Sequence, residues 1–182
     1  AAWIADRLAE LPDAEAVAPG VVITLFGQPC RLEASDKPAR LHPATGEAPA
    51  CITARGEGAA FANAVIRVVR REALRVFTER TAFHCDRLGA RLPSVTIMDA
   101  RARWGSCRPG LPGKPAAIRY SWRLALAPFE VADYVAAHEC AHLLELNHGP
   151  RFWAHVKALV GDERPHRAWL RAEGARLHAF GR

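Results

Sequence analysis

The stretch AAHECAHLLELNHGPRFW, from Ala136 to Trp153, carries three histidines and two glutamates among alanines and leucines. Its apolar residues recur three and four positions apart, which predicts an amphipathic helix that begins at Pro128 and continues to about Asn147. The stretch therefore supports two interpretations. It is either an ordinary helix that happens to carry histidines or a helix that binds a metal ion.

Two of the histidines share one face of this helix. Each helical residue advances by about 100°, so His138 and His142 lie about 40° apart and one turn along the axis. Two imidazoles placed in this way can bind one zinc ion at about 2.0–2.1 Å. Glu139 can reach a water on that ion without being a ligand, which is the mechanical basis of the His-Glu-x-x-His motif.

A catalytic zinc site needs a third protein ligand, and His148 is the first candidate. On a straight helix it would be rotated by about 240° from His142, so the helix must end or turn first. The sequence supplies the means, because Asn147 tolerates the left-handed conformation and Gly149-Pro150 cannot easily continue a helix.

Glu145 is the rival third ligand. It lies within about 20° of His138 on the helical wheel. It could instead accept a hydrogen bond from a ligand imidazole, and we favour this second role. The histidine spacing also matches the metzincin pattern, but that pattern has Gly where Glu145 stands, and no methionine follows the site. We expect one Zn²⁺ per chain, although such sites also accept other divalent transition metals.

The rest of the chain contains no internal repeat and predicts an α+β fold. In this fold a small β-sheet packs on a long helix and on the metal-binding helix, with further helices at the C-terminus. Residues 1–20 are expected to form an N-terminal arm and residues 21–182 a single domain. The expected elements are a hairpin around the Gly-Gln-Pro turn in 21–33, an exposed turn-rich loop at 35–50, a long helix at 59–88 stopped by Gly89, strands in 94–107 (with a break at Gly105) and 116–127, and helices at 128–147, 150–160 and 165–179.

Composition narrows the possible functions. The five cysteines are scattered and form no Cys-x-x-Cys pair, which argues against a disulfide framework and favours a cytoplasmic location. No run approaches the ~18 apolar residues of a membrane-spanning helix, so no membrane partner is expected. The net charge of +6 is compatible with nucleic acid or an anionic substrate, and equally with solvated arginine-rich helix faces.

Three stretches taken together resemble one family. They are RWGSC (Arg103–Cys107), WRLALAPFEVADYVAAHECAHLLELNHGPRFW (Trp122–Trp153) and HRAWL (His166–Leu170). In this order they resemble the YgjP-like metallopeptidases, bacterial zincins related to the SprT and WLM proteases. The resemblance covers about residues 60–180. Cys140 stands where the family more usually has Leu, and the residues before Val21 match nothing that we can place.

The resemblance implies a zincin-like fold, a zinc ion held by His138, His142 and His148, and Glu139 as the general base. It leaves the substrate open. Members are classed as peptidases by motif, yet a nucleotide pyrophosphatase activity towards UTP has been attributed to a member.

Other residues are candidates for supporting roles. Arg103, Arg123 and Arg151 could bind a carboxylate or phosphate of a substrate, and His155 or His166 could stabilise an oxyanion if either reached the site.

The RWGSC stretch also has a structural interpretation. In it, Trp104 packs under the active helix, Gly105 allows a close approach of that helix, and Cys107 is a packed thiol.

Three functions remain. The first is a zinc peptidase, in which an extended strand such as 116–122 pairs with the peptide substrate. The second is a nucleotide pyrophosphatase using the same metal site, although no Gly-rich phosphate loop is present. The third is a basic nucleic-acid-binding module with structural zinc, which would need a fourth protein ligand.

Overall fold

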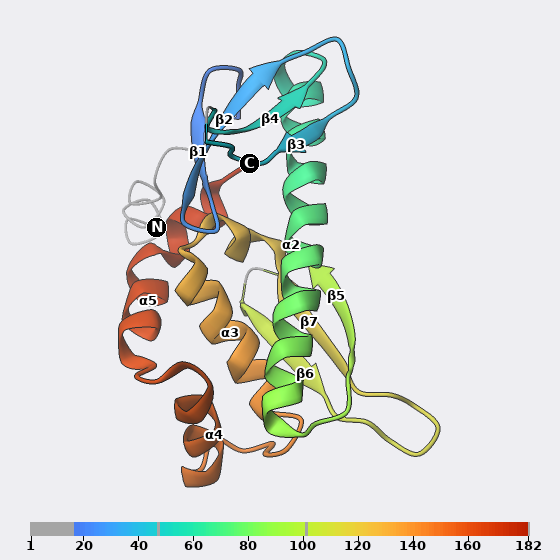
Figure 1. The fold of residues 1–182 in the computed structure, drawn as a ribbon, viewed down its shortest axis with the longest axis vertical. Coiled ribbons are helices and arrows are strands. Elements are labelled where there is room, and N and C mark those ends of the chain that lie inside the picture. Colours follow the sequence, from blue (N-terminus) through green and yellow to red (C-terminus); the bar gives the residue numbers. More distant parts are fainter. Residues whose placement is uncertain (1–16, 47, 101, 182) are drawn as a thin grey trace, which may run out of the picture.

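A single long helix, α2 (Gly58–Leu88), organises the molecule. In the computed structural model, which describes residues 17–46, 48–100 and 102–181, α2 runs beside both β-sheets and packs against the helix that carries the histidines (Figure 1). The sequence predicted this helix over 59–88 and its end at Gly89. The structure confirms both, because Gly89 adopts the left-handed conformation (φ 62°) that ends helices.

The predicted α+β plan is confirmed, with two small sheets rather than one. The first sheet has the order β1-β2-β4-β3, and the second has the order β5-β7-β6. The described residues form four α-helices, of which α2 and α3 pack against the sheets (Figure 1). In chain order the elements are β1 (Val22–Leu25), β2 (Gln28–Ala34), β3 (Arg40–His42), β4 (Ala50–Ala54), α2, β5 (Ser94–Met98), β6 (Gly105–Arg108), β7 (Ala117–Ser121), a 3-10 helix (Trp122–Leu126), α3 (Phe129–Ala141), α4 (Pro150–Val160) and α5 (Arg164–Ala179).

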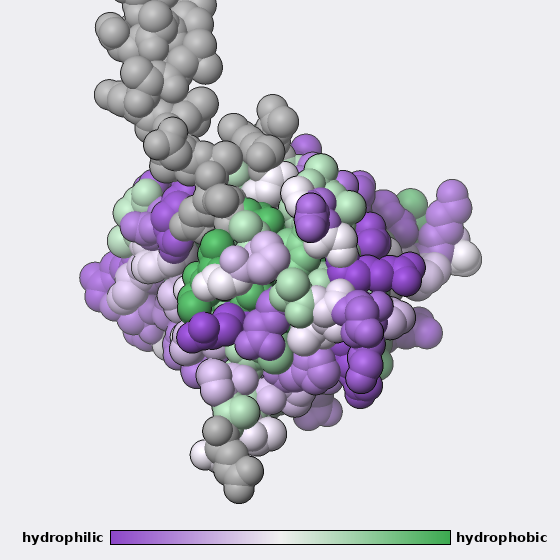
Figure 2. All heavy atoms as spheres, turned by 90° about the horizontal axis from the view of Figure 1, so that it is seen from above, coloured by the Kyte–Doolittle hydropathy of each residue, from purple (hydrophilic) through white to green (hydrophobic). Residues whose placement is uncertain are grey.

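The first sheet differs from the prediction in two places. The hairpin of β1 and β2 forms, but it turns at Phe26-Gly27, and Gln28 already pairs with Leu25. The region 35–50, which was expected to be a loop, contains β3, and its last residue begins β4. The short strand β3 pairs only with β4, at the edge of the sheet. Figure 2 views the molecule from the end at which this sheet lies and shows a small hydrophobic area with polar side chains next to it.

The second sheet lies next to the histidine-bearing helix. Gly105 was expected to interrupt a strand, whereas it begins β6. The predicted strand at 116–127 is extended only to Ser121 and then continues as the 3-10 helix. β7 lies in the middle of this sheet, parallel to β5 and antiparallel to β6, so β6 is an edge strand.

The hydrophobic core joins the second sheet and α2. Tyr120 of β7 stacks on Phe77 of α2 with the ring centroids 4.3 Å apart, and its hydroxyl lies 2.9 Å from the hydroxyl of Thr81. All three side chains are buried, so the polar atoms of this contact have a partner inside the core.

A charged cluster joins α2 to α3. Arg80 donates two hydrogen bonds to the Asp133 carboxylate, at 2.7 and 3.1 Å, and the Nε2 atom of His84 lies 2.7 Å from the same carboxylate. Burial alone would raise the pKa of Asp133, but the hydrogen bonds from His84 and Arg80 outweigh it and hold the pKa below its ordinary value. The cluster therefore fixes the position of α3 on α2 with an ionised carboxylate.

The C-terminal helices lie where the sequence predicted them, at 150–160 and 164–179. The helix predicted at 128–147 is shorter in the structure. It ends at Ala141, and His142 is its C-terminal cap. None of the described helices is long and apolar enough to cross a membrane.

We predict that Asp133→Asn lowers the free energy of unfolding by about 2–3 kcal/mol, because it leaves Arg80 without its ionised partner in a mostly shielded site. The folded-state pKa of Asp133 lies below its unfolded value of about 3.9, so the contribution is complete above pH ~4 and disappears as the pH falls further. Urea unfolding of wild type and variant from pH 7 to pH 3 measures the difference.

The matched control for this change is Glu79→Gln, which removes a carboxylate from an exposed pair with Arg75 on α2. It should change stability by less than about 0.5 kcal/mol. Equal effects of the two variants, or a gap that does not narrow in acid, would contradict the role given to Asp133.

Candidate metal centre

Two of the histidines are positioned by the end of α3. His138 lies in the last turn of this helix and His142 caps it, with their ring centroids 5.0 Å apart. Most residues of α3 are buried, so packing of the helix in the core fixes where both side chains begin. This is the one-turn relationship that the sequence predicted.

The third histidine returns to the first because the chain turns sharply after α3. The amides of Leu143 and Leu144 donate to carbonyls three residues earlier, which tightens the last turn, and the Nδ1 atom of His142 donates to the carbonyl of Glu145 at 3.0 Å. The chain then enters α4 through Gly149, which is the helix N-cap, with Pro150 as the first helical residue. The predicted breaker is therefore confirmed, but the helix ends six residues earlier than expected.

The turn brings the three imidazoles together. The Nε2 atoms of His148 and His138 lie 3.1 Å apart, and one nitrogen from each of His138, His142 and His148 lies within 4.8 Å of the others. Two nitrogens bound to one tetrahedral zinc at 2.0–2.1 Å would be about 3.4 Å apart, so the spacing suits a zinc ion. The three residues could hold a metal ion with small adjustments of their rings.

Phe152 packs against all three imidazoles. It is fully buried on α4, and its ring centroid lies 4.8, 4.5 and 4.6 Å from the rings of His138, His142 and His148. Trp153 lies farther out, about 6 Å from the rings of His138 and His148. These two aromatic residues thus form one wall of the site.

The site favours neutral imidazoles, which is the form that binds metals. The pKa of His138 is lowered to about 3, chiefly by burial and then by the other two histidines. Burial also lowers the pKa of His142. A metal ion can therefore bind these two residues without first displacing protons near neutral pH.

Glu139 follows His138 on α3, and its carboxylate lies against Gly105 of β6 in the second sheet. It is only 6 % exposed, and burial raises its pKa to about 7, while the charge of Arg103 opposes the rise. A Cβ atom added to Gly105 would lie 2.4 Å from the Glu139 Oε1 atom, so only glycine leaves room for this carboxylate. The close approach expected at Gly105 is confirmed. Trp104, which was expected to pack under the helix that carries the histidines, stacks on His178 of α5.

Glu145 contributes in a way that the sequence did not indicate. Its backbone carbonyl, rather than its carboxylate, accepts the hydrogen bond from His142. The carboxylate lies 3.8 Å from Arg151 and does not belong to the group of close ligand atoms. The carboxylate therefore does not make the hydrogen bond to His142 that was predicted for it, and the backbone carbonyl makes that bond instead.

The three candidate arginines lie in different environments. Arg103 is exposed and close enough to Glu139 to influence its charge. Arg151 is highly exposed at the start of α4. Arg123 is buried, pairs with Asp99 and lies over the Trp122 ring, so the structure does not bring it to the histidines.

Of the two candidate histidines, His166 lies near the site and His155 is not among its ring contacts. His166 stacks on Tyr134, with the ring centroids 5.7 Å apart. The Tyr134 hydroxyl in turn lies 3.4 Å from the Nδ1 atom of His138. If His138 binds a metal through Nε2, Nδ1 carries the proton and donates to this hydroxyl, which orients the ring.

Sequence reasoning missed two residues here. Tyr134 lies one turn before His138 on the same helix face, and this spacing was a usable signal. Arg167 lies over the Trp153 ring and helps to lower the pKa of His138. No pattern in the sequence connects Arg167 with the histidines, because it comes from a different helix.

A helix with two histidines and a buried glutamate, completed by a third histidine from the following turn, is an arrangement found in metal-dependent hydrolases. The chain belongs to the YgjP-like family, since the model of the YgjP-like metallopeptidase domain matches residues 1–173. The match extends beyond the motifs that suggested it and includes the predicted N-terminal arm, of which residues 1–16 lie outside the described structure. Searches of curated proteins and of solved structures found no match.

We predict that His148→Ala loses most of the bound metal after dialysis, whereas Glu145→Ala keeps it, because the Glu145 carboxylate is not needed for the hydrogen bond to His142. Inductively coupled plasma mass spectrometry of the purified proteins measures the metal per chain. His155→Ala on the neighbouring helix is the matched control and should retain full occupancy. Retention in His148→Ala with loss in Glu145→Ala would show that the third ligand is Glu145.

Proposed function

We propose that the protein is a zinc-dependent peptidase that cleaves amide bonds of peptides or proteins, with one Zn²⁺ bound by His138, His142 and His148. The observation that carries the proposal is the three-histidine group together with the buried Glu139, the residue after His138 on α3, in a chain of the YgjP-like metallopeptidase family. The group contains three protein ligands and no fourth within the described chain, which supports an open position rather than a closed structural site.

When bound, zinc supplies a lowered pKa for water and polarises a carbonyl oxygen. Glu139 then acts as the general base that accepts a proton from the attacking water and delivers it to the nitrogen of the leaving amine. Its buried position suits both steps, because a raised pKa lets the same carboxyl take and give a proton near neutral pH. Arg103 is the nearby cation that limits this rise and remains a candidate contact for the substrate.

The second sheet offers the substrate an edge at β6. The expectation that strand 116–122 pairs with the peptide is not supported, because β7 already has a neighbour on each side. The amide of Ser121 donates to the carbonyl of Trp104, so the alternating pattern directs the backbone groups of Gly105 and Cys107 away from β7. An extended peptide paired with these groups would run past the Glu139 carboxylate.

A nucleotide substrate has less support. A triphosphate would need several cations around its transition state. One of the three candidate arginines, Arg123, is already paired inside the protein, and Arg151 stands at an exposed helix end. A peptide substrate does not need these additional cations, and UTP is therefore kept only as a comparison substrate.

We predict that Glu139→Gln retains zinc and folding but lowers cleavage of unfolded casein by ~10²-fold or more, because it removes the base and keeps the size. Glu130→Gln, an exposed change on the same helix, is the control and should cleave normally. The wild type should also be incubated with UTP. Pyrophosphate release that disappears in Glu139→Gln, without any casein cleavage, would overturn the peptidase proposal.

A second prediction concerns Gly105→Ala. The added methyl group would displace the Glu139 carboxylate, and a misplacement of about 1 Å can reduce turnover by up to ~10²-fold. We expect a fall in kcat of at least about tenfold with zinc content unchanged. Gly46→Ala is the control, because a Cβ atom there meets nothing within 4 Å. Unchanged kcat in Gly105→Ala would mean that the position of Glu139 does not limit catalysis.

A further inference from the structure

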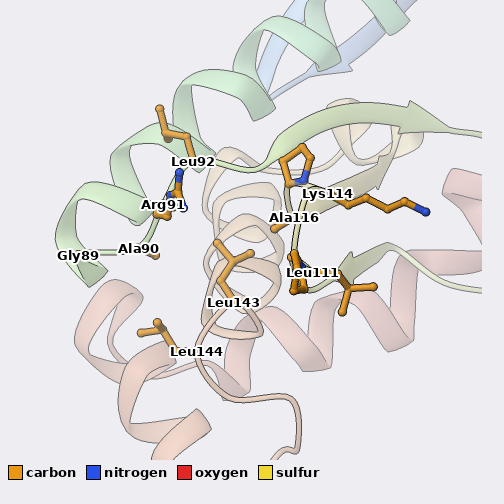
Figure 3. A pocket seen from close by; sticks show the side chains of 13 residues that line it. Gly89, Ala90, Arg91, Leu92, Leu111, Lys114, Ala116, Leu143 and Leu144 are labelled. Carbon is orange, nitrogen blue, oxygen red and sulfur yellow. The ribbon is translucent and has the colours of Figure 1, made fainter.

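A cavity of about 750 Å³ lies beyond the C-terminal end of α3, where Leu143 and Leu144 of the following turn line it. Three segments that are far apart in the sequence form its walls: residues 89–92 after α2, residues 110–116 between β6 and β7, and Leu143-Leu144. Figure 3 shows Leu143 between the end of α2 and the β6–β7 connection. The cavity volume falls in the range of about 300–1,000 Å³ that is usual for binding sites.

Exposed leucines gather around this cavity. Leu92, Leu111 and Leu144 are 66 %, 60 % and 44 % exposed, and each comes from a different wall. They are among the few large apolar side chains that the described part of the chain leaves exposed. Single exposed leucines need no explanation, but three around one cavity indicate a surface that binds something apolar.

The charges around the cavity have one sign. Arg91 and Lys114 are the charged residues of its lining, and no aspartate or glutamate is among the described residues that form it. The occupant should therefore combine large apolar side chains with negative charge, because a basic segment would meet two cations without a counter-charge.

The walls are set by the backbone before anything binds. Gly89 holds the left-handed conformation at the end of α2, and the Leu111 and Lys114 amides and carbonyls exchange two 2.9 Å hydrogen bonds around Gly113. Arg108 also donates to the carbonyl of Pro115 at 3.0 Å. A site with fixed walls loses little entropy when it is occupied.

We propose that this cavity docks an acidic segment rich in leucine-like side chains in the protein substrate, at a distance from the bond that is cut. The inference rests on the proposed peptidase function. Leu144 is two residues after His142, so the two Cα atoms are at most about 7.6 Å apart, and one substrate chain can reach both places. The enzyme would then select substrates by this segment as well as by the residues at the cleaved bond.

The test is direct binding to zinc-loaded Glu139→Gln protein, which keeps the peptide intact and separates docking from cleavage. The probe is a fluorescein-labelled peptide with two leucines, two aspartates and glycine-serine spacers, measured by anisotropy. Two comparison peptides of the same length replace the aspartates by lysine or the leucines by serine. We expect saturable binding of the first peptide and at least roughly tenfold weaker binding of the other two.

Variants of the cavity locate the site. In the same background, Leu144→Asp, Leu111→Asp and Arg91→Glu should each weaken binding by roughly tenfold or more. Leu111 lies on an exposed turn, so this variant remains informative if Leu144→Asp fails to fold. The matched controls are Leu74→Asp on α2 and Arg171→Glu on α5, both exposed and outside the lining, and both should bind as before.

Several outcomes would overturn the proposal. They are the absence of saturable binding up to about 1 mM, equal binding of the lysine peptide, unchanged binding in all the cavity variants, or displacement of the peptide by UTP, which would assign the cavity to an anionic nucleotide. Failure of casein cleavage with intact peptide binding would instead contradict the catalytic proposal and leave the docking site standing.

Discussion

The hydrogen bond from His142 to the carbonyl of Glu145 is the interaction on which the site depends. Together with the backbone hydrogen bonds of Leu143, Leu144 and Glu145 to the end of α3, it closes the turn that follows Ala141. If α3 continued straight, His148 would lie about 15 Å along the axis from His138, and only two imidazoles would meet. The same hydrogen bond fixes the Nδ1 atom of His142 as a donor, which leaves Nε2 free to bind a metal.

Packing converts this turn into a rigid site. Phe152 contacts all three imidazole rings, and the cluster of Arg80, His84 and Asp133 anchors α3 to α2. Burial keeps His138 neutral and raises the pKa of Glu139, so burial sets the protonation of both a proposed metal ligand and the proposed base. Gly105 completes the arrangement by bringing the edge strand β6 against Glu139.

Much of this could be predicted where local periodicity decides the structure. The long helix α2, its glycine stop, and the helices α4 and α5 follow from apolar spacing and from Gly and Pro signals. The three histidines could be grouped because His138 and His142 differ by one turn and a helix breaker follows His148. The apolar pattern at 143–146, by contrast, reads as more helix, and only the contact between His142 and Glu145 reveals the end.

Features that depend on tertiary contacts could not be predicted from local sequence patterns. The strand β3 has three residues and is held by its partner β4 rather than by propensity. Arg123 looks like a free cation in the sequence, but Asp99 and Trp122 enclose it. The hydrogen bond expected from the Glu145 carboxylate is made instead by its backbone carbonyl, which accepts from His142.

The central claim is that a metal bound by this protein has three imidazole ligands and one open position. Zinc K-edge X-ray absorption of the purified wild type tests it most directly. The account predicts three nitrogens at about 2.0–2.1 Å and an additional oxygen from water. A sulfur ligand at about 2.3 Å, or a fourth protein ligand that closes the site, would contradict it.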